Sequence, residues 1–403
     1  MHILIVFHTS FPEIRGGINT MIATLARQWM NAGHRVSIFS PGDWSDINWS
    51  EEKFAGISLY KKRLRLPWDR RSPIKGLIGW ILEFPKTVGE LLQLMKREKV
   101  DILHLHTPRD YQSYFRRLES LGGPPYVLTF HGTDALHFAQ EKGKNFRSLH
   151  KTAKKAAALT AVSMSYARLI GERRPELGHV HYVPNGIEIK SETESAAFPN
   201  RVLEKFRKGV PEKYFVMVGW VEPPKGQDIA VRAWGILGKN HPNLHLLIIG
   251  GQSFLHPGEP HYPGFLEEIE NLIHASGCGA TVHLMGALEA PDVSGVLARA
   301  SGLVFPSHRE GLPYVLLEAA LHGLPVVCND IPAFSDILEN GVHGLLTPDG
   351  DPLALAAAVE RIVNDPELGK KLGKALKDHV TVHFSAERMA RDYLDLFHEV
   401  LHR

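Results

Sequence analysis

The sequence predicts an α/β protein made of two Rossmann-like domains, each built on a parallel sheet. Three observations lead to this prediction. The 403 residues are enough for two domains. Short apolar segments of strand length alternate with helical segments along the whole chain. A polar stretch at residues 183–200, which opens on the turn signal Pro-Asn-Gly, divides this alternation into two halves.

The first half is expected to contain six strands, at residues 1–7, 36–40, 102–106, 126–130, 159–162 and 180–183. Helices are expected between them at residues 19–31, 74–97 and 165–172. The strands are apolar throughout, which suits a sheet covered by helices on both faces.

The second half repeats this scheme, with strands expected at residues 214–219, 244–249, 282–285, 302–305 and 325–329. Its helices are expected at residues 229–240, 265–276, 291–300 and 312–322. We therefore expect an N-terminal domain at 1–185 and a C-terminal domain at 186–383. The amphipathic end of the chain, 384–403, is expected to form a helix that crosses back to the first domain.

Composition and charge narrow the class of protein. Apolar residues make up 44% of the chain, and no apolar run approaches the roughly 18 residues of a membrane span. The first strand has no signal-peptide flanks, and Cys278 and Cys328 form no disulfide framework. A cytoplasmic protein is expected. Residues 1–190 carry +11 and residues 191–403 carry −9, which predicts an anionic partner for the first half.

The opening of the first half differs from two common phosphate-binding motifs. Neither G-x-G-x-x-G after the first strand nor G-x-x-x-x-G-K-[ST] is present. Instead, a long loop ends in Gly16 and Gly17 directly before a helix, where backbone without side chains can approach an anion. The alternative interpretation is an ordinary glycine turn.

Residues 305–327, FPSHREGLPYVLLEAALHGLPVV, contain the strongest functional signal. Glu310 follows a strand at the edge where open α/β sheets bind ligands, and Glu318 lies two turns into the next helix. Pro313 is expected in the first turn of that helix. Carboxylates accept hydrogen bonds from sugar hydroxyls, and a helix N-terminus favours a phosphate. The alternative is a pair of solvated glutamates.

This segment resembles the Glu-x7-Glu motif of retaining GT-B glycosyltransferases of family 4. Further segments resemble the same family: IRGGINTMIATLARQWMNAGHRVSIFSP, DILHLHTP, TFHGTDA, VPNGIEI and GLLTPDGDPLALAAAVERIVNDP. The resemblance implies the GT-B fold, in which the two parallel sheets face a central cleft. It also implies transfer of a sugar from a nucleoside-diphosphate sugar, with UDP as the expected nucleotide.

The resemblance also assigns roles to matching positions. Glu310 would contact the donor sugar, Glu318 the ribose, and Lys225 the departing diphosphate. The backbone at Gly311 and Leu312 would lie near sugar or phosphate, and Gly16 and Gly17 would leave room for the phosphates. His131 would lie beside the reacting carbon, while His106 and Asp134 are candidates for acceptor binding.

One residue departs from the family pattern. The family has Gly-Arg before the Lys-Gly dipeptide, whereas this chain reads GWVEPPKG, with Trp220 in place of the arginine. Arginine would grip a diphosphate through its planar fork, which tryptophan cannot do. Either Arg309 or another base substitutes for it, or stabilisation of the leaving group is reduced. A further alternative is that Trp220 stacks on a ring.

No metal and no cofactor are expected. Asp349 and Asp351 have the spacing of a metal-binding D-x-D motif, but Asp351 precedes Pro352 and a helical run, which predicts a helix N-cap. By resemblance, the acceptor attacks from the face that the leaving group occupies, and the product keeps the donor's configuration. Two alternatives stay open: a two-Rossmann sugar-nucleotide epimerase, and a non-catalytic sugar-nucleotide-binding module.

The acceptor is expected to be a sugar, a lipid-linked precursor or a polysaccharide precursor, and no nucleic acid is expected among the partners. Lys61–Arg71 opens a strongly basic stretch that continues to Lys75 and is followed by the apolar GLIGWILEF. Basic residues beside tryptophan and leucine suit an anionic membrane surface, which would make the protein peripheral at the inner face of a membrane. The alternative is a solvated loop followed by an ordinary core helix.

Overall fold

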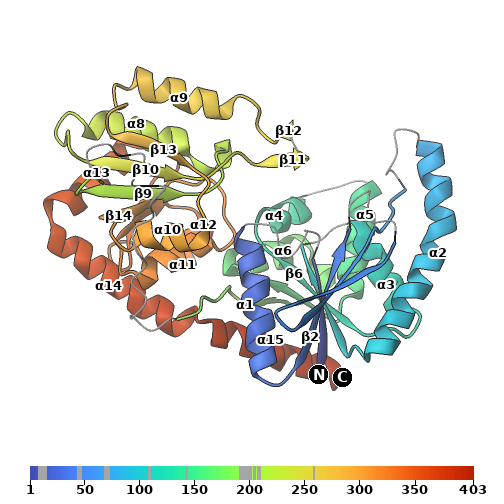
Figure 1. Ribbon diagram of the computed structural model, residues 1–403. Helices are drawn as coiled ribbons and strands as arrows, with labels where there is room; N and C mark the ends of the chain where they lie inside the picture. Colours follow the sequence, from blue (N-terminus) through green and yellow to red (C-terminus); the bar gives the residue numbers. More distant parts are fainter. Residues whose placement is uncertain are drawn as a thin grey trace. The chain divides into compact units, whose positions relative to one another are not determined.

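The structure is a computed structural model that describes residues 1–7, 16–42, 48–67, 73–107, 110–140, 144–189, 202, 206, 210–256 and 259–403. The chain divides into two compact units (Figure 1). Unit 1 comprises Met1–Glu188 together with Ala386–Arg403, and unit 2 comprises Ile189–Ser385. Each unit is an α/β fold in its own right.

Unit 1 is built on an eight-stranded sheet in the order β3-β4-β2-β1-β5-β6-β7-β8. Neighbouring strands are parallel except β3 and β4, which pair as an antiparallel hairpin. The strands are β1 (His2–Val6), β2 (Arg35–Pro41), β3 (Ser50–Phe54), β4 (Ile57–Lys62), β5 (Ile102–His106), β6 (Tyr126–Phe130), β7 (Ala158–Ala161) and β8 (Val180–Tyr182).

The six strands expected from sequence are confirmed, but the β3–β4 hairpin was missed. Ala55 and Gly56 form its turn with φ of 49° and 83°. Backbone with positive φ at two successive positions fits a tight hairpin turn, although alanine is an uncommon residue there. The expectation of a wholly parallel sheet is therefore wrong at this edge of unit 1.

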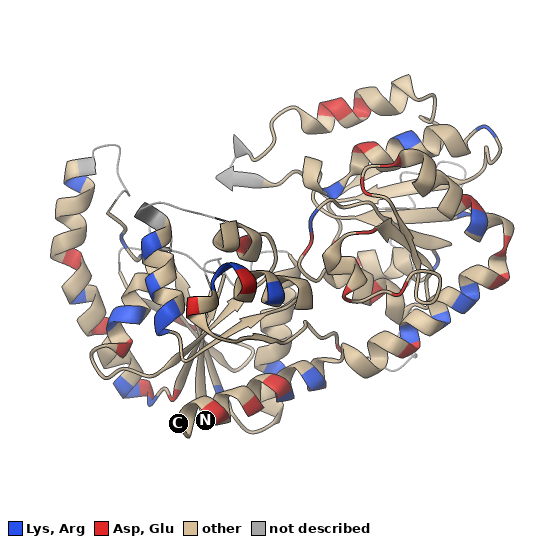
Figure 2. Ribbon diagram, turned by 180° about the vertical axis from the view of Figure 1, so that it is seen from behind, with Lys and Arg blue, Asp and Glu red and all other residues tan. Residues whose placement is uncertain are grey.

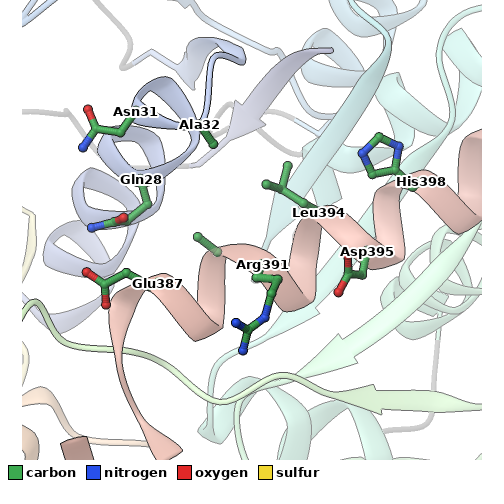
Figure 3. A pocket seen from close by; sticks show the side chains of 9 residues that line it. Gln28, Asn31, Ala32, Glu387, Arg391, Leu394, Asp395 and His398 are labelled. Atoms are coloured by element: carbon green, nitrogen blue, oxygen red, sulfur yellow. The ribbon is translucent and has the colours of Figure 1, made fainter. Parts of the chain in front are cut away.

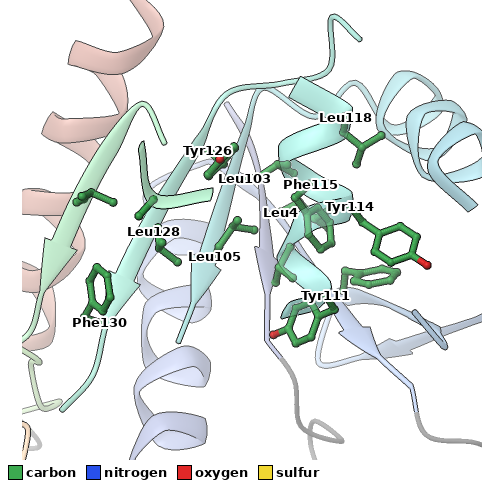
Figure 4. Close-up of a cluster of buried hydrophobic side chains, with 14 of the residues drawn as sticks. Leu4, Leu103, Leu105, Tyr111, Tyr114, Phe115, Leu118, Tyr126, Leu128 and Phe130 are labelled. Carbon is green, nitrogen blue, oxygen red and sulfur yellow. The ribbon is translucent and has the colours of Figure 1, made fainter. Parts of the chain in front are cut away.

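Helices cover both faces of the unit 1 sheet. They are α1 (Gly17–Asn31), α2 (Pro73–Glu98), α3 (Ser113–Glu119), α4 (Thr133–Gln140), α5 (Lys144–Lys155), α6 (Met164–Arg173) and α15 (Ala386–Leu401). Leu103 and Leu105 of β5 belong to the core under α2, α3 and α5 (Figure 4). His104, between them, contacts Trp29 of α1 and Tyr393 of α15. Since successive strand residues point to opposite faces, α1 and α15 cover the other side.

Helix α15 is part of the core of unit 1 although it ends the chain. The indole Nε1 of Trp29, a fully buried residue, donates to the carbonyl of Ala390 at 3.0 Å. A shallow groove runs between α1 and α15 (Figure 3). None of the residues that line it is among those predicted to bind donor or acceptor; they are Gln28, Asn31, Ala32, Glu387, Ala390, Arg391, Leu394, Asp395 and His398.

Unit 2 is built on a six-stranded parallel sheet in the order β13-β10-β9-β14-β15-β16. Its strands are β9 (Tyr214–Val218), β10 (His245–Ile249), β13 (Val282–Gly286), β14 (Gly302–Phe305), β15 (Val326–Asn329) and β16 (Leu345–Thr347). A separate two-stranded ribbon is formed by β11 (Phe254–His256) and β12 (Glu259–Pro260). The five strands expected from sequence are confirmed, and β16 is an addition.

The helices of unit 2 are α8 (Gln227–Leu237), α9 (Phe265–Ala275), α10 (Ala290–Leu297), α11 (Tyr314–Leu321), α12 (Pro332–Ser335), α13 (Pro352–Asn364) and α14 (Pro366–His383). The helix expected from residue 312 begins two residues later, at Tyr314. Pro313 is its N-cap, with extended backbone at φ −75° and ψ 126°, and does not lie in its first turn. Within the described residues, no helix combines the length and apolarity needed to cross a bilayer.

Candidate functional site

In unit 2, two loops leave the carboxyl edge of the sheet side by side. Strands β9 and β14 are parallel neighbours, so their following loops emerge at the same edge. The first loop carries Lys225 in the short 3-10 helix Pro223–Lys225, and the second carries Glu310. The Nζ of Lys225 lies 2.7 Å from Oε1 of Glu310. The structure therefore brings together two of the residues predicted from sequence to act on the donor.

Backbone packing fixes the two loops against each other. Gly226 has φ of 75°, and a Cβ at this position would lie 2.1 Å from the carbonyl oxygen of Pro306. Glycine is required here both by the left-handed conformation and by the close approach. The amide of His308 also donates to the carbonyl of Pro224 at 2.9 Å. A rigid backbone thus positions the Lys225–Glu310 pair.

The ion pair is largely shielded from solvent, with side-chain exposures of 19% for Lys225 and 9% for Glu310. Burial disfavours the Lys225 ammonium, but the neighbouring Glu310 carboxylate outweighs it, and the pKa of Lys225 lies above its ordinary value. Lys225 is therefore a fixed positive charge at neutral pH, suited to a diphosphate group.

Glu318 lies one residue past the first turn of α11 and is half-buried. Desolvation raises the pKa of its carboxyl group above the ordinary value. Among the described residues, none donates a hydrogen bond or forms an ion pair to this carboxylate. A desolvated carboxylate without a partner is costly, and hydroxyl donors from a ligand would remove that cost.

The other unit 2 residues predicted to bind the donor lie in or next to the same two loops. Trp220 follows β9 with 39% of its surface exposed, and its carbonyl accepts from the Gln227 amide at 2.8 Å. Arg309 is exposed next to Glu310, while Gly311 is half-buried and Leu312 is buried just before α11. Trp220 and Arg309 are thus both accessible to a ligand at this edge.

A hydrogen-bonded group of three polar side chains close to Glu310 was not predicted from sequence. The His308 ring lies 2.6 Å from the Asp349 carboxylate, which also accepts from the Asn329 amide at 2.7 Å. His308 and Asp349 follow β14 and β16, and Asn329 is the last residue of β15, so the shared strand edge was the signal that could have revealed them. Asp351 accepts from the amides of Leu353 and Ala354, which confirms that it caps α13.

In unit 1, His106 and His131 lie where the parallel neighbours β5 and β6 end. Their rings stack, and Nδ1 of His106 is 2.9 Å from Nε2 of His131. Burial, together with the nearby His104 and His131, holds the pKa of His106 well below its ordinary value. Neutral His106 therefore orients the His131 ring through one ring-to-ring hydrogen bond.

Asp134, a predicted acceptor-binding residue, also holds the backbone around His131. Its carboxylate accepts hydrogen bonds from the backbone amides of His131, Gly132 and Ala135 at 2.6–3.0 Å. These bonds cap the N-terminus of α4 and fix the backbone of His131. Asp134 therefore positions the backbone of His131.

Gly16 and Gly17 lie where they were expected, at the start of α1. Gly16 is the N-cap residue, with φ of 152°, and a Cβ at this position would meet nothing within 4 Å. This holds for the described residues alone, because residues 8–15 lie outside the described part of the chain, and anion binding at this N-terminus stays a prediction.

The basic stretch from Lys61 is not a free cationic loop. Lys62 is ion-paired with Glu90, and the buried Arg65 is ion-paired with Glu83. Lys61 is held within 3.8 Å of Glu52. For Lys62 and Arg65 the expected membrane contact is therefore wrong, because α2 neutralises both. Arg70 and Arg71 lie outside the described residues.

No group of three or more His, Cys, Asp and Glu side chains in the described part of the chain is arranged to hold a metal ion. His104, which alternates with His106 along β5, is instead fully buried, and its Nε2 lies 2.7 Å from the Thr129 hydroxyl. Burial holds the pKa of His104 well below its ordinary value.

Comparisons with known proteins match both halves of the chain to family models. Residues 15–191 match the model of Glycosyltransferase Family 4, and residues 201–379 match that of Glycosyl transferases group 1. A D-inositol 3-phosphate glycosyltransferase of Paenarthrobacter aurescens is 23% identical over 96% of this chain and 93% of its own.

Solved structures show the same fold. Sucrose-phosphate synthase from Thermosynechococcus elongatus superimposes with a TM-score of 0.77 at 20% identity, covering 99% of this chain and 98% of its own. Anabaena HepE in complex with UDP-glucose superimposes with a TM-score of 0.75 at 16% identity, covering 99% and 100%. The chain thus has the GT-B fold, belongs to glycosyltransferase family 4 and is a glycosyltransferase.

Proposed function

We propose that this glycosyltransferase moves a sugar from a UDP-sugar to an acceptor with retention of configuration and without a metal ion. The observation that carries the proposal is the shielded Lys225–Glu310 pair at the carboxyl edge of the unit 2 sheet. It places a permanent cation and a hydroxyl acceptor within one hydrogen bond of each other. Glu318 lies in the helix that follows Glu310.

The chemistry follows from these charges. The bond between the anomeric carbon and the β-phosphate oxygen breaks, and its electron pair stays on the phosphate. Lys225 stabilises that negative charge, as a metal ion does in other transferases. The donor would displace Lys225 in part from Glu310, so that the carboxylate becomes free to accept hydrogen bonds from sugar hydroxyls.

Retention is proposed to occur on one face of the sugar. The acceptor oxygen forms its bond to the anomeric carbon where the phosphate leaves, and its proton passes to a phosphate oxygen. A double displacement would need a free carboxylate as nucleophile. Glu310, the buried carboxylate of this edge, is proposed to bind the sugar hydroxyls and not the anomeric carbon. His131, fixed by Asp134 and His106, is proposed to contact the transferred sugar or the acceptor.

UDP is proposed as the nucleotide because the solved complex of Anabaena HepE contains UDP-glucose, and its fold matches along this chain. Glu318 is proposed to bind the two ribose hydroxyls, which would supply the missing partners of its carboxylate. A lipid-linked or polysaccharide precursor is proposed as acceptor, with the protein peripheral at the inner face of a membrane.

The protein should release UDP from UDP-glucose faster when a panel of simple sugars and lipid-linked saccharides is present. Proton NMR of freshly formed product should show the donor's α configuration, and EDTA should leave the rate unchanged. An inverted product would contradict the one-face route. Loss of activity in EDTA, restored by Mg²⁺ or Mn²⁺, would assign Asp349 to a metal site. Donor turnover unaffected by any acceptor would favour the epimerase alternative.

A further inference from the structure

Helix α2 exposes a stripe of large aliphatic side chains in its first three turns. Ile74, Leu77, Ile78, Ile81 and Leu82 are 72%, 45%, 53%, 54% and 72% exposed. Their spacings of three and four residues place them along one side of the helix. Five adjacent aliphatic side chains in solvent form a patch of the kind that marks an interaction surface. We call these five residues the α2 stripe.

The stripe is not the face by which α2 packs on unit 1. Trp80 and Phe84 stack with ring centroids 4.9 Å apart, and Phe84 lies 4.4 Å from the ring of Tyr114 in α3. Farther along, Val88 and Leu91 are buried in the core. Helix α2 thus has two apolar faces, and unit 1 covers only the one that contains Phe84, Val88 and Leu91. The alternative of an ordinary core helix holds for that face and not for the stripe.

Two ion pairs hold α2 in this orientation. Arg65 and Lys62, which precede the helix in the chain, pair with Glu83 and Glu90 of α2. The Arg65 side chain is buried, whereas Glu83 is 54% exposed. The basic stretch therefore fastens the helix to unit 1 and leaves the stripe facing outward.

Exposed lysine and arginine side chains lie on the same side of unit 1 as the stripe. Helix α3 packs against both α2 and α5, so the three helices share one side of the unit 1 sheet. Helix α5 contains no acidic residue, and Figure 2 shows basic residues along it. Arg147, Lys151 and Lys154 are exposed there at helical spacing, and Lys75 is exposed on α2. An apolar stripe flanked by lysine and arginine is complementary to an anionic lipid surface.

We propose that the α2 stripe inserts into the headgroup region of an anionic lipid bilayer, with the basic residues of α5 against the lipid phosphates. This inference rests on the proposed function in one respect. A bound membrane would supply the lipid-linked acceptor that we propose for the enzyme. A second copy of the chain suits the stripe less well. A symmetric contact between two stripes would bring two α5 helices, both basic, toward each other.

Co-sedimentation tests the proposal with vesicles of phosphatidylcholine alone and of equal parts phosphatidylcholine and phosphatidylglycerol. The full chain should sediment with the anionic vesicles at low salt and dissociate at high salt. Ile78→Glu combined with Leu82→Glu should weaken binding about a hundredfold, because two apolar side chains are lost and two negative charges added. Lys151→Gln combined with Lys154→Gln should weaken it roughly thirtyfold.

The matched control is Leu353→Glu combined with Val382→Glu, since these unit 2 residues are 67% and 66% exposed. The control should bind vesicles as the wild type does, and thermal unfolding followed by circular dichroism should show that every variant is folded. Vesicle binding that is absent in the wild type, or unchanged in the stripe variant, would overturn the proposal. A wild-type dimer that the stripe variant converts to a monomer would assign the stripe to a second copy. Wild-type protein that binds vesicles but not UDP would instead refute the proposed function alone.

Discussion

Glu310→Gln is expected to lower kcat roughly a hundredfold to a thousandfold, with a much smaller change in KM for the donor. The amide has the same shape as the carboxylate, but it has one acceptor oxygen in place of two and carries no charge. Hydrogen bonds to the sugar hydroxyls at the reacting centre would therefore weaken most in the transition state. Steady-state kinetics with UDP-glucose measure both parameters.

The same substitution leaves Lys225 without its partner in a shielded position, so the free energy of unfolding should fall by about 1–3 kcal/mol. The matched control is Glu367→Gln, which breaks the surface pair with Lys370 at 2.7 Å, where both side chains are at least 74% exposed. That variant should keep wild-type kinetics and stability. A Glu310→Gln enzyme with wild-type kcat would remove Glu310 from the catalytic centre.

Lys225→Met is expected to reduce kcat/KM by a similar factor, because the leaving diphosphate loses its fixed positive charge. Methionine keeps much of the apolar stem, so lost packing contributes little. Lys370→Met is the matched surface control. Combining Lys225→Met with Glu310→Gln should cost less than the two single losses together, because the residues act as a pair. Strictly additive losses would mean that the ion pair in the structure has no part in turnover.

The raised pKa of Lys225 adds a pH dependence to this variant. A base whose pKa is higher in the folded protein stabilises the fold at pH values below its unfolded pKa of about 10.5. That contribution disappears as pH rises through the higher folded pKa. Thermal unfolding should therefore show a stability difference between wild type and Lys225→Met that shrinks in the alkaline range.

The sequence predicted the strands well because each is a short apolar run, and parallel β5 and β6 match the expected ranges residue for residue. The β3–β4 hairpin was missed because its strands are rich in charge and its turn is Ala55-Gly56 rather than Asn-Gly. The local sequence pattern alone does not identify this hairpin. Pairing of β4 with β2, which is a tertiary contact, stabilises it.

The site could be predicted as a set of residues but not as a set of contacts. Lys225 and Glu310 are 85 positions apart, and their ion pair depends on the approach of Gly226 to Pro306. The role of Asp134 depends equally on backbone geometry, because its carboxylate lies under the turn that it caps. Motifs identify which side chains belong to the site, whereas loop packing decides what each one touches.

For the basic stretch, too, the sequence identifies the charged residues but not the contacts that they make. Seven lysine and arginine residues between positions 61 and 75 suggest a free cationic surface. The acidic partners of Lys62 and Arg65 are Glu90 and Glu83 of the next helix, and their pairing is a tertiary contact that the sequence does not show. The exposed stripe, by contrast, depends on which face of α2 packs inward, and that requires the tertiary structure.

Calorimetric titration of UDP into the full chain tests the central claim that unit 2 holds a nucleoside diphosphate. We predict one UDP per chain, and roughly tenfold weaker binding by Glu318→Gln, because the amide loses one of two ribose hydrogen bonds. The same variant should be more stable than wild type at pH 7 but not at pH 4. The raised pKa of Glu318 makes its ionised form costly to fold above the ordinary value of 4.5. Absence of UDP binding by the wild type, or equal affinity in the variant, would contradict the assignment of this edge to the donor.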